Sequence, residues 1–271
     1  MKEDTMIKIF ATDMDGSLLD TESRLPEDIE ALINRITEQN KVFIAASGRT
    51  LTNLEHKFKD TKADISYISD NGAVVKHKGE LLYVNKLDPR DVTDTINAFK
   101  KAVDSTTVVI TPTMAYIDSE HEEHHKFLVE YYTHLTLVDN LLDYSEDVIK
   151  ITAVSPHHSH DNFVNHINGK LNDNVYAVEA GHVWIDVMNI GVNKGVALQY
   201  LMDILDVKHD EVASFGDYYN DLELIQVPKY GYVLENAPDD IKELAYEVIG
   251  SNSDNSVYLK IEALLSIENT D

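Results

Sequence analysis

Cysteine is absent from this chain of 271 residues, which excludes disulfide bonds, thiolate nucleophiles and zinc bound by cysteine. Long hydrophobic runs are also missing, since no apolar stretch approaches the roughly 20 residues that a helix needs to span a bilayer. The N-terminal stretch carries acidic residues before the first apolar run and lacks the apolar segment of a signal peptide. Together these absences predict a cytoplasmic protein.

Basic residues are scarce. Lys and Arg number 23 against 48 Asp and Glu, which gives a formal net charge of −25. A surface of this sign repels nucleic acid and anionic membranes, so we expect neither as a partner. It also repels phosphorylated small molecules, and a phosphate site would need a local cluster of cations, metal or helix N-termini. No pattern in the chain defines an oligomeric state.

Strand and helix patterns alternate at both ends of the chain. We expect strands at residues 6–12, 42–46, 65–68, 212–215 and 230–234, and helices that begin near residues 26, 50, 193, 221, 239 and 256. A β-hairpin is expected at residues 73–85. Strands separated by helices of this length imply parallel crossovers, so the predicted fold class is α/β with a doubly wound parallel sheet.

The middle of the chain has a different pattern. We expect helices at residues 91–103, 120–132 and 161–171, and strands at 107–111, 114–119, 149–155, 175–179 and 182–188. Consecutive strands with helices on one side predict a separate α+β layer. The predicted organisation is a core formed by residues 1–84 and 187–271, with an inserted α+β cap at 85–186 that determines substrate specificity.

The most informative motif is Asp13-Met14-Asp15-Gly16-Ser17-Leu18, which follows the first expected strand directly. Two carboxylates this close repel each other unless one holds a proton or a cation lies between them. Such a pair suits a nucleophile beside a general acid/base. The alternative is a surface turn stabilised by aspartate side chains.

Two further motifs could bind an anion. Ser47-Gly48-Arg49 follows an expected strand and offers a hydroxyl, a flexible backbone N–H and a helix N-terminus, although Ser-Gly also begins ordinary helices. Lys194 lies in the first turn of an expected helix, where the helix dipole disfavours a cation. An anion within its reach would explain that placement, and a solvated lysine is the alternative.

A fourth motif runs from Gly216 to Asp221. Asp217, Asn220 and Asp221 supply oxygen donors of the kind that Mg²⁺ prefers, although the segment could also cap the helix that follows. Parallel strands bring their carboxyl ends to one edge, so Asp13, Asp15, Asp217 and Asp221 would share a crevice. Without a cation their mutual repulsion would cost several kcal/mol. The sequence therefore predicts a magnesium site.

These four motifs, together with Ser69-Asp70-Asn71-Gly72-Ala73, resemble the haloacid dehalogenase superfamily in order and spacing over essentially the whole chain. More narrowly, the chain resembles the Cof-type sugar-phosphatase branch, which inserts a large cap between the second and third motifs. The resemblance implies a Mg²⁺-dependent phosphatase of small phosphorylated metabolites, sugar phosphates in particular, that forms an aspartyl-phosphate on Asp13.

The resemblance also implies a role for each site residue. Asp13 would be the nucleophile, Asp15 the general acid/base, and Ser47 and Lys194 would hold the phosphoryl oxygens. Mg²⁺ would bind Asp13, the carbonyl of Asp15 and Asp217, with Asn220 and Asp221 in support. Gly48, Arg49, Asn71 and Asn220 would line the phosphate side, and His182 and Trp184 of the cap would contact the rest of the substrate. For Trp184, a structural role in a core or interface is the alternative.

One residue departs from the family pattern, because Tyr218 stands where relatives usually carry a small residue such as Ser or Gly. It leaves the metal ligands in place and bears on substrate size. Two other functions are alternatives: a phosphomutase of the same superfamily, and a non-catalytic sugar-phosphate sensor, which would be expected to lack Asp13 or Asp15. A dinucleotide-dependent dehydrogenase fits poorly, since no Gly-x-Gly-x-x-Gly follows the first strand.

Overall fold

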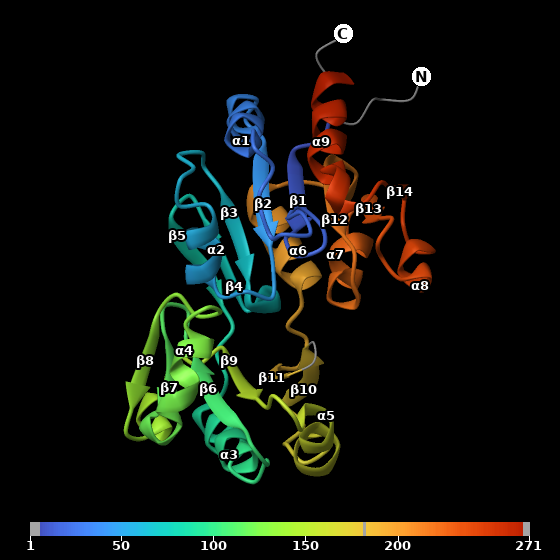
Figure 1. The fold of residues 1–271 in the computed structure, drawn as a ribbon. Coiled ribbons are helices and arrows are strands. Elements are labelled where there is room, and N and C mark those ends of the chain that lie inside the picture. Colours follow the sequence, from blue (N-terminus) through green and yellow to red (C-terminus); the bar gives the residue numbers. More distant parts are fainter. Residues whose placement is uncertain (1–5, 181–182, 268–271) are drawn as a thin grey trace. The chain divides into compact units, whose positions relative to one another are not determined.

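The structure is a computed structural model that describes residues 6–180 and 183–267 (Figure 1). The chain forms two compact units. The first unit comprises the described residues up to Gly48, Lys57–Tyr83 and those from Asn193 onward, and the second comprises Arg49–His56 and Val84–Val192. Among the described residues, no helix is both long and apolar enough to cross a bilayer.

The first unit contains an eight-stranded sheet in the order β14-β13-β12-β1-β2-β3-β4-β5. Its strands are β1 (Ile9–Asp13), β2 (Val42–Ala46), β3 (Ser66–Ser69), β4 (Val74–His77), β5 (Glu80–Val84), β12 (Val212–Gly216), β13 (Tyr230–Leu234) and β14 (Glu247–Ile249). The strands from β14 to β3 pair in parallel, and β4 runs antiparallel to β3. The predicted doubly wound α/β fold is confirmed.

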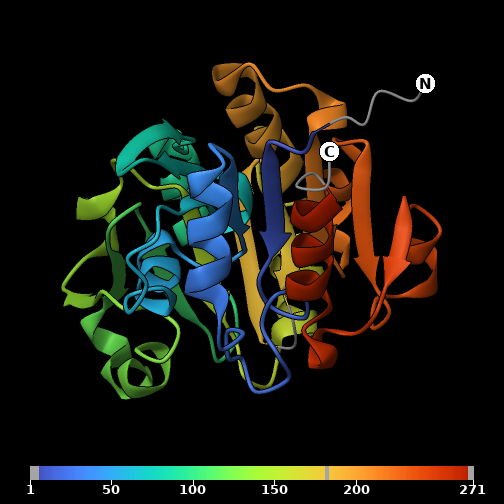
Figure 2. The ribbon, with the colours of Figure 1, turned by 90° about the horizontal axis from the view of Figure 1, so that it is seen from above.

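Helices cover both faces of this sheet (Figure 2). They are α1 (Ile29–Glu38), α6 (Lys194–Leu205), α7 (Leu222–Gln226), α8 (Asp239–Lys242) and α9 (Ser256–Ile267). Helix α2 (Leu51–Lys57) follows β2 in the chain and belongs, except for its last residue, to the second unit. In α6 the apolar residues Ala197, Leu198, Leu201 and Met202 repeat at helical spacing and are fully buried. They pack against Ile9 and other residues of the central strands, and this contact holds the first turn of α6 beside the sheet.

The second unit contains a six-stranded sheet in the order β10-β11-β9-β6-β7-β8. Its strands are β6 (Thr106–Ile110), β7 (Ala115–Asp118), β8 (Leu135–Val138), β9 (Lys150–Val154), β10 (Val175–Ala180) and β11 (Trp184–Asn189), and its helices are α3 (Pro89–Phe99), α4 (His125–Leu128) and α5 (Ser159–Asn162). Val92, Ile96 and Phe99 of α3 pack on Ile151 and Val187 of the sheet. The unit is therefore an α+β layer with a core of its own.

Several local predictions are wrong. The helix expected at residues 120–132 is a 3₁₀ turn, Ser119–His124, followed by the four-residue α4, because histidine and tyrosine have low helix propensity there. The helix expected at 161–171 is α5 followed by a single π turn, Phe163–Ile167. Strands β8 and β14 were not predicted. Two of the three residues of β14 are exposed, so it lacks the apolar pattern of a buried strand.

The compact units differ from the predicted core (1–84 and 187–271) and cap (85–186) in three places, the smallest being Val84, which belongs to the second unit. The chain leaves the second unit at Asn193, since Ile190 N donates to Asn174 O at 2.9 Å and Tyr176 Oη donates to Val192 O at 3.2 Å. In addition, Arg49–His56 belongs to the second unit, in which Asn53 Nδ2 donates to Tyr131 O at 3.1 Å.

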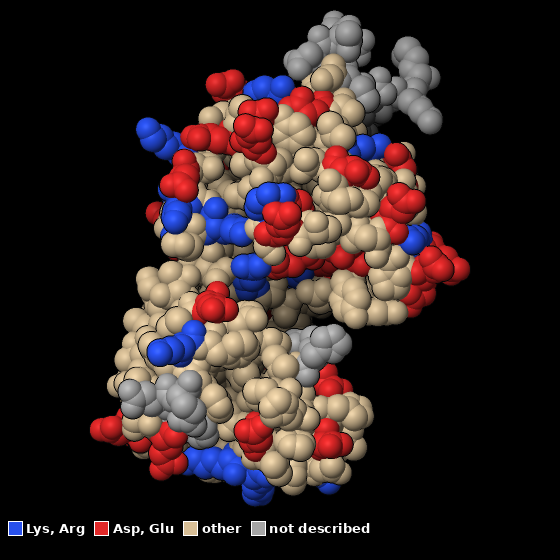
Figure 3. Space-filling model, viewed as in Figure 1, with Lys and Arg blue, Asp and Glu red and all other residues tan. Residues whose placement is uncertain are grey.

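Acidic side chains are distributed over the visible surface of both units, with Lys and Arg between them (Figure 3). Within the first unit, Lys8 pairs with Glu211, Arg35 with Glu262 and Lys260 with Glu247. Each pair is at least partly exposed, and such pairs contribute little to stability. The exposed acids account for much of the net charge, whereas the acids of the site described next are largely withdrawn from solvent.

Candidate active site

The site lies at the carboxyl edge of the first unit's sheet. Asp13 is the last residue of β1, and the neighbouring strands β2 and β12 are followed by Ser47 and Asp217. The register aligns Asp13 with Ala46 of β2 and Thr12 with Phe215 of β12, so the three strand ends are adjacent. The connections diverge on either side of β1, which is where doubly wound sheets bind ligands.

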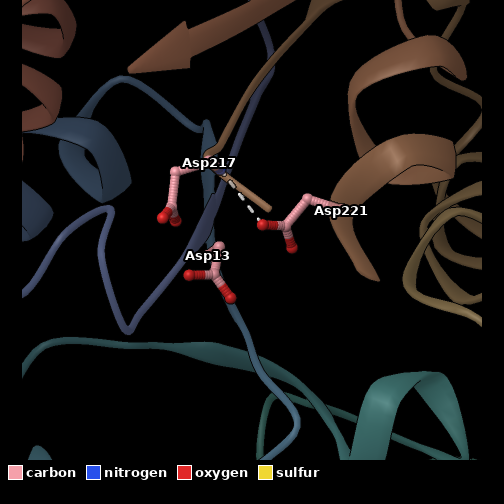
Figure 4. Close-up of side chains that lie close together, drawn as sticks. All are labelled: Asp13, Asp217 and Asp221. Atoms are coloured by element: carbon pink, nitrogen blue, oxygen red, sulfur yellow. Dashed lines mark hydrogen bonds between the residues drawn. The ribbon is translucent and has the colours of Figure 1, made fainter. Parts of the chain in front are cut away.

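Three carboxylates converge at this edge (Figure 4). Asp13, Asp217 and Asp221 each offer one oxygen, and these oxygens all lie within 4.8 Å of one another. Asp13 and Asp221 are buried and Asp217 is partly buried, so water screens their repulsion poorly. The arrangement therefore requires compensating positive charge.

Lys194 supplies part of that charge. Asn193 caps α6 by accepting a hydrogen bond from Val196 N at 2.8 Å, which fixes Lys194 in the first helical turn. The Lys194 side chain is 0% exposed, and its Nζ donates to Asp13 Oδ1 at 2.5 Å and to Asp221 Oδ1 at 2.6 Å. Burial alone would lower the pKa of Lys194, but the two carboxylates raise it, so the ammonium stays charged.

One ammonium does not balance three carboxylates. Burial raises the pKa of Asp13 well above its usual value, and Asp221 and Asp217 raise it further against the opposing effect of Lys194. Burial also raises the pKa of Asp217, to about 6, where a hydrogen bond from Ser17 opposes the change. A divalent cation would replace the protons that these groups retain. The oxygen donors present fit Mg²⁺.

Asp221 organises the loop that follows β12. Its Oδ1 accepts the hydrogen bond from Lys194, and its Oδ2 accepts the backbone N–H groups of Asp217 and Tyr218, each at 3.1 Å. A Cβ on Gly216 would lie 2.6 Å from Cβ of Asp221, so only glycine fits beneath this loop. Both oxygens of Asp221 thus serve to position other groups.

Two residues that contact Asp217 were not assigned a role from the sequence. Ser17 Oγ donates to Asp217 Oδ1 at 2.7 Å. Asn236 Nδ2 donates to Gly16 O at 2.9 Å and to Asp217 Oδ2 at 3.3 Å, and so connects the loops after β1 and β12. Ser17 stands inside the first motif, and Asn236 follows β13 at the same edge. Polar residues after every parallel strand were the signal that could have identified both.

The loop after β3 contacts both the predicted anion-binding residue Ser47 and the backbone at the start of α6. Asn71 N donates to Ser47 O at 3.0 Å, and Asn71 Oδ1 accepts Nδ2 of Asn220 at 3.2 Å. Gly72 has a φ of +101°, and a Cβ there would lie 2.2 Å from the carbonyl oxygen of Asn193. Glycine at this position therefore lets the loop after β3 approach the backbone that precedes Lys194.

Three further predicted residues, Asp15, Gly48 and Arg49, differ in exposure and in the unit to which they belong. Asp15 is exposed, two residues beyond Asp13. Gly48 packs against Asn71, since a Cβ on Gly48 would lie 3.1 Å from Asn71 Oδ1. Arg49 belongs to the second unit, where its Nη1 donates to Asn53 Oδ1 at 3.0 Å.

The sequence also predicts that Trp184 and His182 contact the part of the substrate beyond the phosphate. Trp184, in the second unit, stacks on Phe127 with ring centroids 5.8 Å apart and meets Tyr131 edge to face at 4.8 Å. Phe127 and Tyr131 are exposed, and Tyr132 completes the aromatic cluster. His182 lies outside the described residues.

The fold and the site define a hydrolase class with an aspartate-rich centre at the edge of a doubly wound sheet. The family model of the haloacid dehalogenase-like hydrolases matches residues 10–261. The chain belongs to this family, and its prediction as a Cof-type member is confirmed.

Proteins of known name and structure are similar over nearly the whole chain. The 5-amino-6-(5-phospho-D-ribitylamino)uracil phosphatase YbjI of Escherichia coli (strain K12) is 25% identical over 268 residues, 97% of each chain. The HMP-PP phosphatase of Klebsiella pneumoniae (strain 342) is 27% identical over 248 residues, 90% of this chain and 91% of its own. The structure of SMU.1108c from Streptococcus mutans UA159 has a TM-score of 0.84 at 25% identity and covers 96% of this chain and 99% of that one. The predicted enzyme class, a phosphoric monoester hydrolase, is confirmed.

Proposed function

We propose that this protein is a Mg²⁺-dependent phosphatase of small phosphorylated metabolites that acts through an aspartyl-phosphate on Asp13. The observation that carries the proposal is the buried ammonium of Lys194 between Asp13 and Asp221, with Asp217 in the same group of oxygens. A charged, desolvated lysine against the nucleophile lowers the pKa of that carboxyl and so opposes the rise that burial and the neighbouring carboxylates cause. Sugar phosphates are the substrate class predicted from the sequence. Because the relative YbjI is named as the phosphatase of an ester that carries a uracil ring, we include such esters among the candidate substrates.

In the first half-reaction Asp13 attacks phosphorus. Lys194 holds Oδ1 of Asp13, so we assign the attack to Oδ2. As the new bond to phosphorus forms, the ester P–O bond breaks, and Asp15 in its protonated form gives its proton to the leaving oxygen. Asp15 is exposed at the edge of the site, which allows exchange of this proton with solvent.

In the second half-reaction water releases the phosphate. Asp15, now a carboxylate, takes a proton from the water molecule as its oxygen attacks phosphorus. The bond between phosphorus and Asp13 breaks, inorganic phosphate leaves, and both aspartates return to their starting forms. Ser47 and Lys194 stabilise the charge on the phosphoryl oxygens in both steps, with Asn71 and the N–H of Gly48 on the same side.

Asp13, the carbonyl of Asp15 and Asp217 would hold the Mg²⁺ ion, and Asp221 and Asn220 would support them. When bound, Mg²⁺ supplies positive charge that neutralises the carboxylates and the phosphoryl group. Ser17 and Asn236 orient the carboxylate of Asp217, and partners of this kind strengthen metal binding.

We assign substrate selection to the predicted cap, residues 85–186. The exposed aromatic cluster around Trp184 supports this role, since aromatic rings bind the apolar faces of sugars and heterocycles. Arg49, held by Asn53, is assigned to the phosphate, and His182 and Trp184 to the remainder of the substrate.

The test is phosphate release from a panel of sugar phosphates, nucleotides and flavin or pyridoxal phosphates, measured with Mg²⁺ and with EDTA. Release that requires Mg²⁺ and is lost in Asp13→Asn supports the proposal. Release that persists in Asp13→Asn would overturn the aspartyl-phosphate mechanism. Phosphate transfer within the substrate without release would identify a phosphomutase, and tight binding without turnover would identify a sensor.

A further inference from the structure

Two exposed tyrosines follow the aspartate assigned to the metal. Tyr218 is 56% exposed and Tyr219 is 47% exposed, although Gly216 before them and Asp221 after them are buried. Their rings meet edge to face with centroids 5.0 Å apart. A large aromatic surface is thus presented to solvent within one residue of Asp217.

Both tyrosines are held in place. Tyr218 N donates to Asp221 Oδ2 at 3.1 Å, which ties its backbone to the carboxylate that Lys194 also contacts. Tyr219 Oη donates to Asp240 Oδ2 of α8 at 3.1 Å, and the same hydrogen bond raises the pKa of Tyr219. The Tyr219 ring is thus anchored at its hydroxyl, and the Tyr218 ring packs against it. Both contacts restrict motion before a ligand binds, which lowers the entropic cost of stacking on the pair.

The position of Tyr218 limits what can lie against it. A phosphoryl group held by Asp13, Ser47 and Lys194 places its leaving group within a few bonds of phosphorus. The loop from Asp217 to Asp221 borders that space, since Asp217 and Asp221 lie in the same group of oxygens as Asp13. Tyr218 carries no positive charge to attract phosphate, whereas its ring faces suit a flat, uncharged ring.

We propose that Tyr218 is a specificity-determining residue that stacks on a planar heterocycle in the leaving group, so that the site prefers phosphate esters that carry such a ring over plain sugar phosphates. Tyr219 is the positioning residue that supports the Tyr218 ring from its edge. The inference rests on the proposed function, because it concerns the leaving-group side of the same site.

The test compares uridine 5′-monophosphate with ribose 5-phosphate. The two substrates share the sugar phosphate, and the first carries a uracil base where the second carries a hydroxyl group. KM and kcat are measured for the wild type, Tyr218→Ala, Tyr218→Phe and the control Tyr246→Ala. Tyr246 is a matched control because it is 57% exposed and in the same unit, but packs on Tyr230 and Tyr232. Binding of both ligands to Asp13→Asn and to Asp13→Asn/Tyr218→Ala, measured by equilibrium dialysis, provides a readout that does not need turnover.

The expected result is a roughly tenfold rise in KM for uridine 5′-monophosphate in Tyr218→Ala, the size of one ring-stacking contact, with KM for ribose 5-phosphate unchanged. Tyr218→Phe should retain the wild-type preference, and Tyr246→Ala should behave as the wild type. Equal changes for both substrates, or no change, would overturn the inference. The inference would also be overturned if Tyr218→Ala hydrolysed bulky esters faster and still preferred uridine 5′-monophosphate. Tyr218 would then act as a steric barrier. Absence of phosphate release from every ester would instead count against the proposed function.

Discussion

Ser17 and Asp217 are 200 positions apart in the chain, and Ser17 Oγ donates a hydrogen bond to Asp217 Oδ1 at 2.7 Å. Ser17 is buried and Asp217 is partly buried. The hydrogen bond opposes the rise in the pKa of Asp217 that burial causes. A side chain of the first loop thus orients the carboxylate of another loop that we propose as a metal ligand, and its hydrogen bond favours the ionised form.

Ser17→Ala should weaken metal binding without removing a ligand. Loss of a residue that orients a metal ligand typically lowers metal affinity about 10- to 100-fold, so the Mg²⁺ concentration for half-maximal activity should rise by at least about tenfold. Direct Mg²⁺ titration by calorimetry checks the same change without turnover. The control is Ser266→Ala, an exposed serine of α9. Unchanged Mg²⁺ affinity in Ser17→Ala would contradict the assigned role.

Lys194→Met should destabilise the protein as well as inactivate it. Removing one partner of a buried charge cluster typically costs about 3–5 kcal/mol, because Asp13 and Asp221 lose their compensating charge. Urea unfolding at pH 8 measures this loss. The double variant Lys194→Met/Asp221→Asn removes one of the two carboxylates and should recover part of the stability but none of the activity. Equal stability of the single and double variants would argue against charge as the cause.

The stability of the metal-free protein should fall as pH rises through the titration of Asp217. Its pKa of about 6 in the folded state exceeds the usual 3.8, so the folded state binds the proton more tightly than the unfolded state. The contribution is present below about pH 4 and is lost as pH passes 6, on the order of 3 kcal/mol. Unfolding in EDTA at pH 4.5 and pH 8 should therefore show a smaller pH dependence in Asp217→Asn than in the wild type. Identical dependence in the two proteins would contradict the assignment.

Added Mg²⁺ should stabilise the protein more at pH 8 than at pH 5. Protons on Asp13 and Asp217 compete with the metal ion at the lower pH, since burial raises the pKa of both groups. Thermal unfolding with and without Mg²⁺ measures the difference, and K⁺ at equal ionic strength is the control for screening. A shift in Tm that is the same at both pH values would oppose metal binding at these carboxylates.

Gly72→Ala should be far more damaging than Gly79→Ala. Both glycines have positive φ, +101° and +79°, so alanine is strained at either position. A Cβ at Gly72 would also lie 2.2 Å from Asn193 O, whereas at Gly79 it would meet nothing within 4 Å. We expect a loss of roughly 1 kcal/mol at Gly79 and several kcal/mol at Gly72, with activity impaired only at Gly72. Similar unfolding free energies for the two variants would show that the close approach to α6 is unimportant.

The core strands were predictable because their sequence pattern is local. The apolar runs that became β1, β2, β12 and β13 are each followed by polar turn residues, and burial follows directly from such runs. Strand β8 was missed because it has only four residues, of which only Val138 is buried, so its apolar pattern is weak. In these segments tertiary contacts outweigh weak local propensities.

The site was predictable in its components and not in its contacts. Asp13, Ser47 and Asp217 were assigned to the site because each stands at the end of an apolar run that forms a parallel strand. Asn236 was missed, because a single asparagine after β13 has no motif around it. The direct role of Asp221 in holding backbone N–H groups also depends on a loop conformation that the sequence does not specify.

The hydrophobic pattern alone predicts the alternating strands and helices of the core, its parallel sheet and the edge at which the polar motifs gather. These follow from hydrophobic periodicity and from the right-handed connection of parallel strands, which are properties of short segments. Only the tertiary structure decided that Lys194 lies between Asp13 and Asp221, that Ser17 and Asn236 hold Asp217, and that burial raises the pKa of Asp13. Each of these depends on distances between atoms remote in the chain and on the exclusion of water, because charge interactions strengthen as both separation and dielectric screening decrease.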